Sequence, residues 1–151
     1  MKPKAYVACA LTCVPGERKG EFEQRLALVK RTLQDHGYEI LEFVGLIGGS
    51  SEDVYRHDIH ECVGKADILV ALCDYPGTGL GYELCYAVEV RKIPVLAVAH
   101  ISSVVTRLVL GIDMEKYEFS RYGNVFDLEH CVSDWITMQL PALAMLAQHD
   151  E

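Results

Sequence analysis

Residues 67–100 read DILVALCDYPGTGLGYELCYAVEVRKIPVLAVAH, and this stretch decides the fold. Its short apolar run, Ile68–Leu72, is typical of a buried strand, and the turn signal Asp74-Tyr75-Pro76 ends it. Three glycines follow at 77, 79 and 81, then a helical pattern to about Lys92 and a second strand-like run over 95–99. Strand, loop, helix and strand form a βαβ unit. In a parallel sheet this unit places the glycine loop at the carboxyl end of a strand, where open α/β sheets bind ligands.

The rest of the chain alternates in the same way. The pattern predicts strands over 5–11, 38–44 and 116–120, and helices over 22–34, 52–65, 102–110 and 127–147. Gly37 is expected to end the first helix, 45–51 to form a glycine-serine loop, and Pro141 to interrupt the last helix. This alternation predicts one domain over 1–151, with a Rossmann/flavodoxin-like α/β fold. Its doubly wound sheet should have about five mainly parallel strands, with helices on both faces.

Charge and composition exclude several classes of function. The chain has 14 basic and 22 acidic residues, a formal charge of −8, and no basic stripe, so binding to a nucleic-acid polymer is disfavoured. No apolar stretch is long enough to span a membrane. The apolar run after Met1–Lys4 resembles a short signal peptide, but it equally makes a buried first strand, and a cytoplasmic protein is expected. Six cysteines without CxxC spacing predict reduced thiols.

Glu83 is the first candidate for chemistry. It lies in the first turns of the helix after the glycine loop, where the helix dipole favours an ionised carboxylate. A pre-positioned, ionised carboxylate is what attack on an anomeric carbon requires. The alternative is that Glu83 only complements the helix dipole, and the residues alone leave both open. Asp58 is either a second working carboxylate or an exposed residue of the preceding helix.

Three further candidates, one cluster and two single residues, have two interpretations each. The first is a cluster of possible metal ligands, in which two histidines three residues apart could supply half of the ligands of a metal site. The sequence shows no second set of ligands to complete it, so no metal is expected. The cluster consists of His57, His60, Glu61 and Cys62. Tyr75 is either a turn residue or a pocket wall. Thr106 is either a phosphate-binding hydroxyl or a helix cap. The glycine loop does not fit the dinucleotide fingerprint, because its third glycine comes too early and no acidic residue ends the next strand.

A specific pattern is formed by Asp58, the segment ADILVA at 66–71, the loop and helix start PGTGLGYEL at 76–84, and Lys92. This pattern resembles the nucleoside 2-deoxyribosyltransferase superfamily, and within it most closely the 2'-deoxynucleoside 5'-monophosphate N-hydrolases. The opening strand segment YVACAL at 6–11 is similar to the first strand and the phosphate-side loop of that family. The resemblance covers about residues 4–112 and is strong over 66–98.

The resemblance implies a role for each matching residue. Glu83 matches the nucleophile, Asp58 the carboxylate near the base and leaving group, Tyr6 a pocket tyrosine, and Thr106 a phosphate-binding serine. The implied substrate-binding segments add Cys9, Ala10, Tyr75, Gly77, Thr78, Gly79 and Gly81. Two positions depart from the pattern: 9–12 read CALT instead of a Gly-Ser-x-Arg-Gly type loop, and Gly77 stands where a second phosphate serine is expected, with Thr78 adjacent.

The function implied by the resemblance is cleavage of the N-glycosidic bond of 2'-deoxyribonucleosides or their 5'-monophosphates. A glycosyl-enzyme on Glu83 would be resolved by water, or by another base, with hydrolysis favoured over transfer. The family also implies a homodimer with sites near the subunit interface, a small-molecule nucleoside or nucleotide substrate, and no metal or organic cofactor. Two alternatives stay open: a non-catalytic nucleotide-binding sensor with the same pocket, and a ribonucleotide phosphoribohydrolase.

Overall fold

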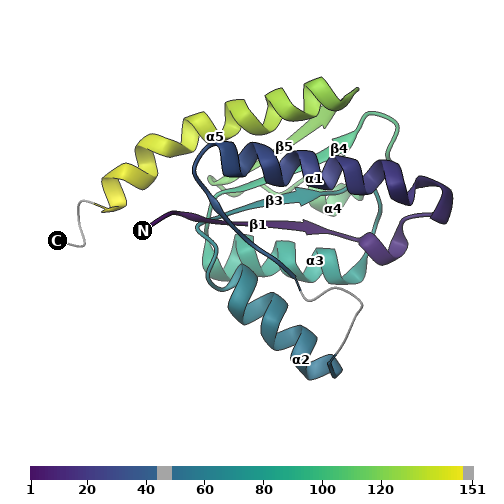
Figure 1. The fold of residues 1–151 in the computed structure, drawn as a ribbon, viewed down its shortest axis with the longest axis horizontal. Helices are drawn as coiled ribbons and strands as arrows, with labels where there is room; N and C mark the ends of the chain where they lie inside the picture. Colours follow the sequence, from purple (N-terminus) through teal and green to yellow (C-terminus); the bar gives the residue numbers. More distant parts are fainter. Residues whose placement is uncertain (44–48, 148–151) are drawn as a thin grey trace.

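A computed structural model describes residues 1–43 and 49–147, and Figure 1 shows its fold. Five parallel strands form one sheet in the order β2-β1-β3-β4-β5. The strands are β1 (Lys4–Cys9), β2 (Glu39–Leu41), β3 (Ile68–Leu72), β4 (Val95–His100) and β5 (Tyr117–Tyr122). The three central strands are almost wholly buried, as their continuous apolar runs require. The predicted α/β fold is confirmed.

Helices cover both faces of the sheet (Figure 1). One face carries α1 (Lys19–Asp35) and α5 (Val125–Ala147), which pack against each other and against side chains such as Val7 and Val70. The other face carries α2 (Ser51–Tyr55), its continuation η3 (Arg56–Val63), α3 (Thr78–Cys85) and its continuation η4 (Tyr86–Arg91). The short turns η1 (Leu11–Cys13) and η2 (Gly16–Arg18) join β1 to α1, and α4 (Arg107–Leu110) precedes β5. Alternate residues of each strand therefore enter opposite cores.

Several predicted elements differ from those observed. The first strand, predicted to run to residue 11, ends at Cys9, and Leu11 already belongs to the turn η1. The strand predicted over 38–44 covers only Glu39–Leu41, because this edge strand pairs with β1 alone. Val44 and most of the predicted 45–51 loop lie outside the described residues. The helix predicted over 102–110 begins only at Arg107, because Thr106 accepts a hydrogen bond from the Leu108 N–H and caps α4 there. Pro141 does not interrupt the last helix, since α5 runs through it to Ala147. Gly37, predicted to end the first helix, does follow α1, and its φ of +90° is typical of a glycine just beyond a helix end.

The helix predicted over 52–65 changes its winding at Arg56. It starts as α2 with a capping box between Ser50 and Asp53, and continues as the π-helical segment η3, in which hydrogen bonds join residues five apart. The Gly64 N–H donates to the Ile59 carbonyl oxygen at 2.6 Å and closes the segment. The sequence pattern does not reveal this change. Ile59, Cys62 and Val63 are the buried residues of η3, and their spacing also fits the apolar side of an ordinary α-helix.

Gly64→Ala should destabilise the protein by about 1–3 kcal/mol, because an added methyl has no room at the end of η3. A Cβ at residue 64 would lie 2.4 Å from the His60 carbonyl oxygen and 2.8 Å from that of Ile59. Urea unfolding measures the change. Gly20→Ala in α1 is the matched control, because a Cβ there meets nothing within 4 Å. Equal stability of the two variants would show that the close approach at Gly64 is not present in solution.

Candidate active site

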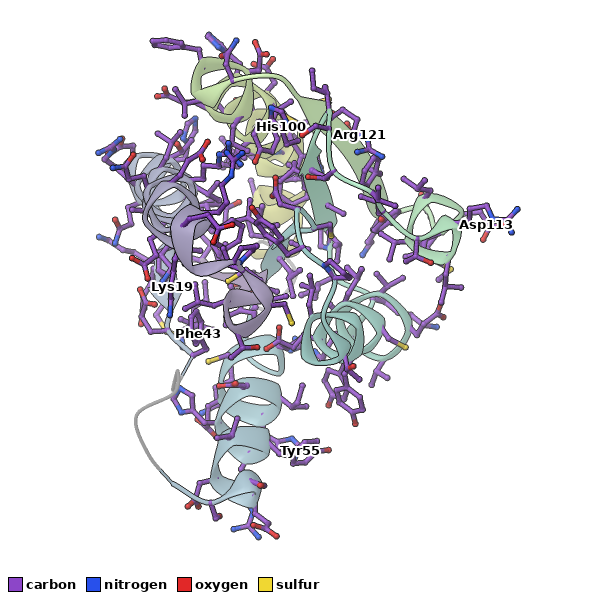
Figure 2. All side chains as sticks on the ribbon, turned by 90° about the vertical axis from the view of Figure 1, so that its right-hand side faces the viewer. Lys19, Phe43, Tyr55, His100, Asp113 and Arg121 are labelled. Carbon is purple, nitrogen blue, oxygen red and sulfur yellow. The ribbon has the colours of Figure 1, made fainter. Side chains whose placement is uncertain are left out.

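A cleft of about 220 Å³ opens at the carboxyl ends of β1 and β3. These two strands are the topological switch point of the sheet, because the chain continues from β1 to one side and from β3 to the other. Figure 2 looks onto this edge of the molecule. The residues that line the cleft are Tyr6, Cys9, Ala10, Leu11, Thr12, Cys13, Phe43, Val54, Asp58, Gly77, Thr78, Gly79, Leu80 and Glu83. Both predicted catalytic carboxylates are among them.

Glu83 lies in the second turn of α3, where its side chain turns back towards β1. Its Oε1 accepts a hydrogen bond of 2.8 Å from the Tyr6 hydroxyl. Burial raises the pKa of Glu83 to about 7, the Tyr6 hydrogen bond lowers it in part, and the charge of Asp58 raises it further. The expected full ionisation at neutral pH is therefore wrong, because burial outweighs the Tyr6 hydrogen bond. Glu83 also lies beyond the first turn of α3, where the helix dipole acts most strongly.

Tyr6 reaches Glu83 because strand alternation directs it to the α3 side of the sheet. Its side chain is 1% exposed and belongs to the core beneath η3 and α3. Burial and the negative charge of Glu83 raise the pKa of Tyr6 well above its usual range. The hydroxyl therefore keeps its proton and acts as a permanent hydrogen-bond donor, which fixes the orientation of the carboxylate.

Asp58 enters the cleft from η3. The residue is half-buried, and its charge contributes to the raised pKa values of both Glu83 and Tyr6. Asp58 and Glu83 therefore lie near enough to interact within the cleft. Two neighbouring carboxyl groups in one cleft are the set of side chains that acid and nucleophile roles need.

The three glycines of the central loop, at 77, 79 and 81, differ in whether a larger side chain would fit in their place. A Cβ at Gly77 would lie 2.6 Å from the Ala10 Cβ, so only glycine lets this segment approach the end of β1 as it does. A Cβ at Gly79 or Gly81 would meet nothing within 4 Å, and neither residue has a positive φ. None of the three glycines therefore serves an unusual backbone angle. Gly77 alone is required by close packing within the chain.

Three of the predicted site residues lie outside the cleft. Tyr75, Gly81 and Thr106 line a neighbouring pocket of about 120 Å³, which shares Gly77 and Leu80 with the cleft. The Tyr75 ring packs edge-on against Phe22 of α1, at 5.5 Å between ring centroids. Within one chain, the structure therefore does not bring Tyr75 or Thr106 to Glu83.

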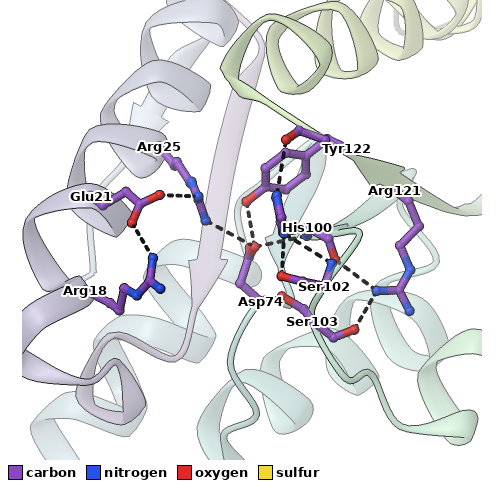
Figure 3. A network of polar contacts seen from close by, with 10 residues as sticks. Arg18, Glu21, Arg25, Asp74, His100, Ser102, Ser103, Arg121 and Tyr122 are labelled. Atoms are coloured by element: carbon purple, nitrogen blue, oxygen red, sulfur yellow. Dashed lines mark hydrogen bonds and ion pairs between the residues drawn. The ribbon is translucent and has the colours of Figure 1, made fainter.

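Asp74 holds the ends of three strands together beside the cleft (Figure 3). Its Oδ1 accepts hydrogen bonds from the His100 N–H at 3.0 Å and the Tyr122 hydroxyl at 2.5 Å. Arg25 of α1 lies 3.7 Å from the same oxygen. Asp74 thus links the end of β3 to the ends of β4 and β5. This network stiffens the wall from which the glycine loop departs.

Sequence reasoning missed six residues that line the cleft: Leu11, Thr12, Cys13, Phe43, Val54 and Leu80. The carboxyl-end rule for parallel strands could have found the first four, because they directly follow β1 or β2. Phe43 was missed because the second strand was predicted to run to Val44.

In the part of the chain that the structure describes, one group of side chains could hold a metal ion, formed by His57, Asp58 and Cys62.

Two curated proteins match most of the chain. A protein of Syntrophotalea carbinolica is 30% identical over 119 residues, which cover 76% of this chain and 81% of the relative. A protein of Thermofilum pendens is 31% identical over 135 residues, which cover 81% and 87%. Both carry the provisional name 2'-deoxynucleoside 5'-phosphate N-hydrolase 1. This chain belongs to that N-hydrolase family. The resemblance seen in the sequence motifs is confirmed.

The fold of this N-hydrolase family member also occurs among solved structures. The CMP N-glycosidase of Clostridium botulinum superposes with a TM-score of 0.67 over 86% of this chain and 98% of that chain. At 14% identity, this likeness shows the fold alone. No family model matches the chain. None of the helices among the described residues combines the length and apolar character needed to cross a membrane.

Proposed function

We propose that this protein hydrolyses the N-glycosidic bond of 2'-deoxynucleoside 5'-monophosphates and releases the free base and 2-deoxyribose 5-phosphate. The observation that carries the proposal is the hydrogen bond between Tyr6 and the buried Glu83, in the same cleft as Asp58. Membership in the N-hydrolase family supports the substrate class. The position of the cleft, at the switch point of the sheet, supports a nucleotide ligand.

The proposed reaction has two steps. An oxygen of the Glu83 carboxylate attacks C1' as the bond from C1' to the base nitrogen breaks, and Asp58 delivers a proton to the departing base. The product is a glycosyl ester on Glu83. Water then attacks C1' and gives its proton to Asp58, which lost one in the first step, while the ester bond breaks and Glu83 returns as a carboxylate. This is the two-step logic of retaining glycosidases. A second free base could take the place of water, which would make the reaction a transfer.

The 5'-phosphate would bind at the amino-terminal end of α3. None of the residues that line the cleft is Lys or Arg. The N-cap residue Gly77 makes no side-chain cap, so the first N–H groups of α3 have no partner of that kind. Such a helix end favours an anion. Thr12 and Thr78 also line the cleft and add hydroxyl groups.

Tyr6→Phe should shift the acidic limb of the pH–rate profile to higher pH. Glu83 must lose its proton to attack, so kcat/KM should rise with pH through about 7, the pKa of Glu83. The Tyr6 hydrogen bond lowers that pKa, and its loss should raise it. Measuring kcat/KM from pH 5 to pH 9 tests this. Tyr38→Phe is the control, because Tyr38 lies between α1 and β2 and does not line the cleft. An unshifted acidic limb in Tyr6→Phe would contradict the role of the hydrogen bond.

The proposal includes a homodimer, in which Thr106 of one subunit would reach the cleft of the other. Val104 and Leu108 flank Thr106 and are 88% and 81% exposed. Apolar side chains so exposed on a small surface support a contact face here.

Leu108→Glu should weaken the dimer by about 30-fold or more in Kd and lower activity with it. Sedimentation velocity measures the dissociation of the dimer, with Met138→Glu on α5 as the control. A dimer unchanged in Leu108→Glu would exclude this face.

Chromatography of a substrate panel tests the function itself. The panel contains deoxynucleosides, deoxynucleoside 5'-monophosphates and ribonucleoside 5'-monophosphates, each with and without a second free base. Release of base from deoxynucleotides is the expected result. New nucleosides that form only with added base would make the protein a transferase. Release from ribonucleotides alone would move the assignment to a phosphoribohydrolase, and no release from any compound would favour a binding module.

A further inference from the structure

His57, Asp58 and Cys62 form a cluster of metal-ligand side chains at the wall of the cleft. Their ligand atoms, one from each side chain, all lie within 4.8 Å of one another. An imidazole nitrogen, a carboxylate oxygen and a thiolate sulfur are the three ligand types that Zn²⁺ accepts in proteins. Asp58 lines the cleft itself, while Cys62 is buried behind it. The cluster therefore joins the candidate catalytic carboxylate to two side chains without a proposed catalytic role.

The π-helical winding of η3 creates this cluster. In an α-helix, residues five apart point about 140° away from each other, so His57 and Cys62 would not meet. Hydrogen bonds between residues five apart bring them to one face of η3. His60, which the sequence paired with His57, is not a member of the cluster. His60 is exposed, and its ring packs edge-on against Tyr55 at 5.3 Å.

The surroundings of the cluster suit a cation. The Glu42 carbonyl oxygen accepts hydrogen bonds from His57 Nε2 at 2.7 Å and from the Cys62 thiol at 3.3 Å, so one oxygen holds two of the three side chains in place. Four carboxylates, those of Asp58, Glu83, Glu42 and Glu61, interact electrostatically with Cys62. A divalent ion among these groups would reduce their mutual repulsion.

We propose that the His57–Asp58–Cys62 cluster binds Zn²⁺ and that the bound ion inhibits the enzyme. The Glu42 carbonyl oxygen or a water molecule would complete a tetrahedral set. Ligand atoms of a tetrahedral zinc ion lie roughly 3.5 Å apart, so the distances between the three ligand atoms, now within 4.8 Å, would shorten by about 1.3 Å at most. The Cys62 thiol releases its proton to solvent as the Zn–S bond forms. The inhibition rests on the proposed function, because a coordinated Asp58 is unable to protonate the departing base.

Cobalt binding tests the site without any use of activity. Co²⁺ added to the metal-free protein should give the ligand-field bands of a tetrahedral ion and a thiolate charge-transfer band. Cys62→Ala should lose the charge-transfer band, and His57→Gln should weaken binding at least tenfold. The controls Cys85→Ala and His60→Gln, at exposed positions, should bind as the wild type does. Binding that survives both cluster variants, or that is lost on replacing Cys9 or Cys13 instead, would overturn the site.

Turnover in the presence of zinc tests the inhibition. Each protein is compared with its own metal-free rate, so a change in basal activity does not affect the result. Zinc should slow the wild type at least tenfold and leave Cys62→Ala unaffected. If Cys62→Ala fails to fold by circular dichroism, His57→Gln provides the same comparison. Full wild-type turnover with zinc bound would overturn the inhibition. A protein that turns over no substrate but binds cobalt would show instead that the proposed function, and not the metal site, had failed.

Discussion

Glu83→Gln is expected to lower kcat for base release by about 10³-fold or more, because the amide has no anionic oxygen with which to attack C1'. The substitution keeps the size of the side chain and an oxygen that accepts from Tyr6. Chromatographic measurement of free base gives the rate. Glu89→Gln, at an exposed position of η4 on the same continuous helix, is the matched control and should keep wild-type activity. Turnover of Glu83→Gln within a few-fold of the wild type would remove Glu83 from the mechanism.

The same variant should be more stable than the wild type at alkaline pH. The pKa of Glu83 in the folded protein is about 7, above its ordinary value of 4.5. A carboxyl with a raised pKa stabilises the fold fully below pH 4.5 and loses this contribution as pH rises through 7. Glu83→Gln avoids that loss, so its advantage should grow to about 3 kcal/mol at pH 8. Urea unfolding at pH 5 and pH 8 measures it, and an equal difference at both would show that Glu83 is not desolvated.

Asp58→Asn is expected to lower kcat by about 10²–10⁴-fold, the usual contribution of a general acid. The amide cannot pass a proton to the departing base, although it fills the same space in the cleft. Rates of base release from a series of monophosphates measure the effect. The loss should be largest for the bases that leave least readily, because these depend most on protonation.

Glu61→Gln is the control for Asp58→Asn. Glu61 belongs to the same η3 segment, but its carboxylate is exposed and pairs with Lys65. Exposed ion pairs contribute little to stability, so this variant should keep both fold and activity. An Asp58→Asn variant equally slow for every base would mean that Asp58 positions the substrate and does not donate a proton.

The parallel sheet and the place of the cleft could be predicted because both follow from long-range rules. Buried apolar runs such as Ile68–Leu72 and Val95–His100 identify central parallel strands, and the switch point between β1 and β3 follows from their order. The motif around Glu83 then places a carboxylate at that edge. The Glu83–Asp58 pair was within reach of sequence analysis for this reason.

The remaining features depend on local geometry that residue patterns do not record. Burial raises the pKa of Glu83, and the Tyr6 hydrogen bond that offsets part of this rise joins residues 77 positions apart. Each hydrogen bond of η3 spans one residue more than in an α-helix, and this winding brings Cys62 to His57. Tyr75 lies next to the glycine loop in sequence, but its ring turns to Phe22 on the opposite face of the sheet.

The contact between Gly77 and Ala10 couples two positions in the evolution of this chain. Only one of them has room for a methyl group, since a Cβ at 77 would lie 2.6 Å from the Cβ at 10. A serine at 77, where the resemblance places a phosphate-binding hydroxyl, becomes acceptable only after residue 10 has lost its side chain. The two substitutions are therefore epistatic, and the accessible mutational path runs through Ala10→Gly before Gly77→Ser. Across homologues, the two positions should covary in size, with a side chain at one and glycine at the other.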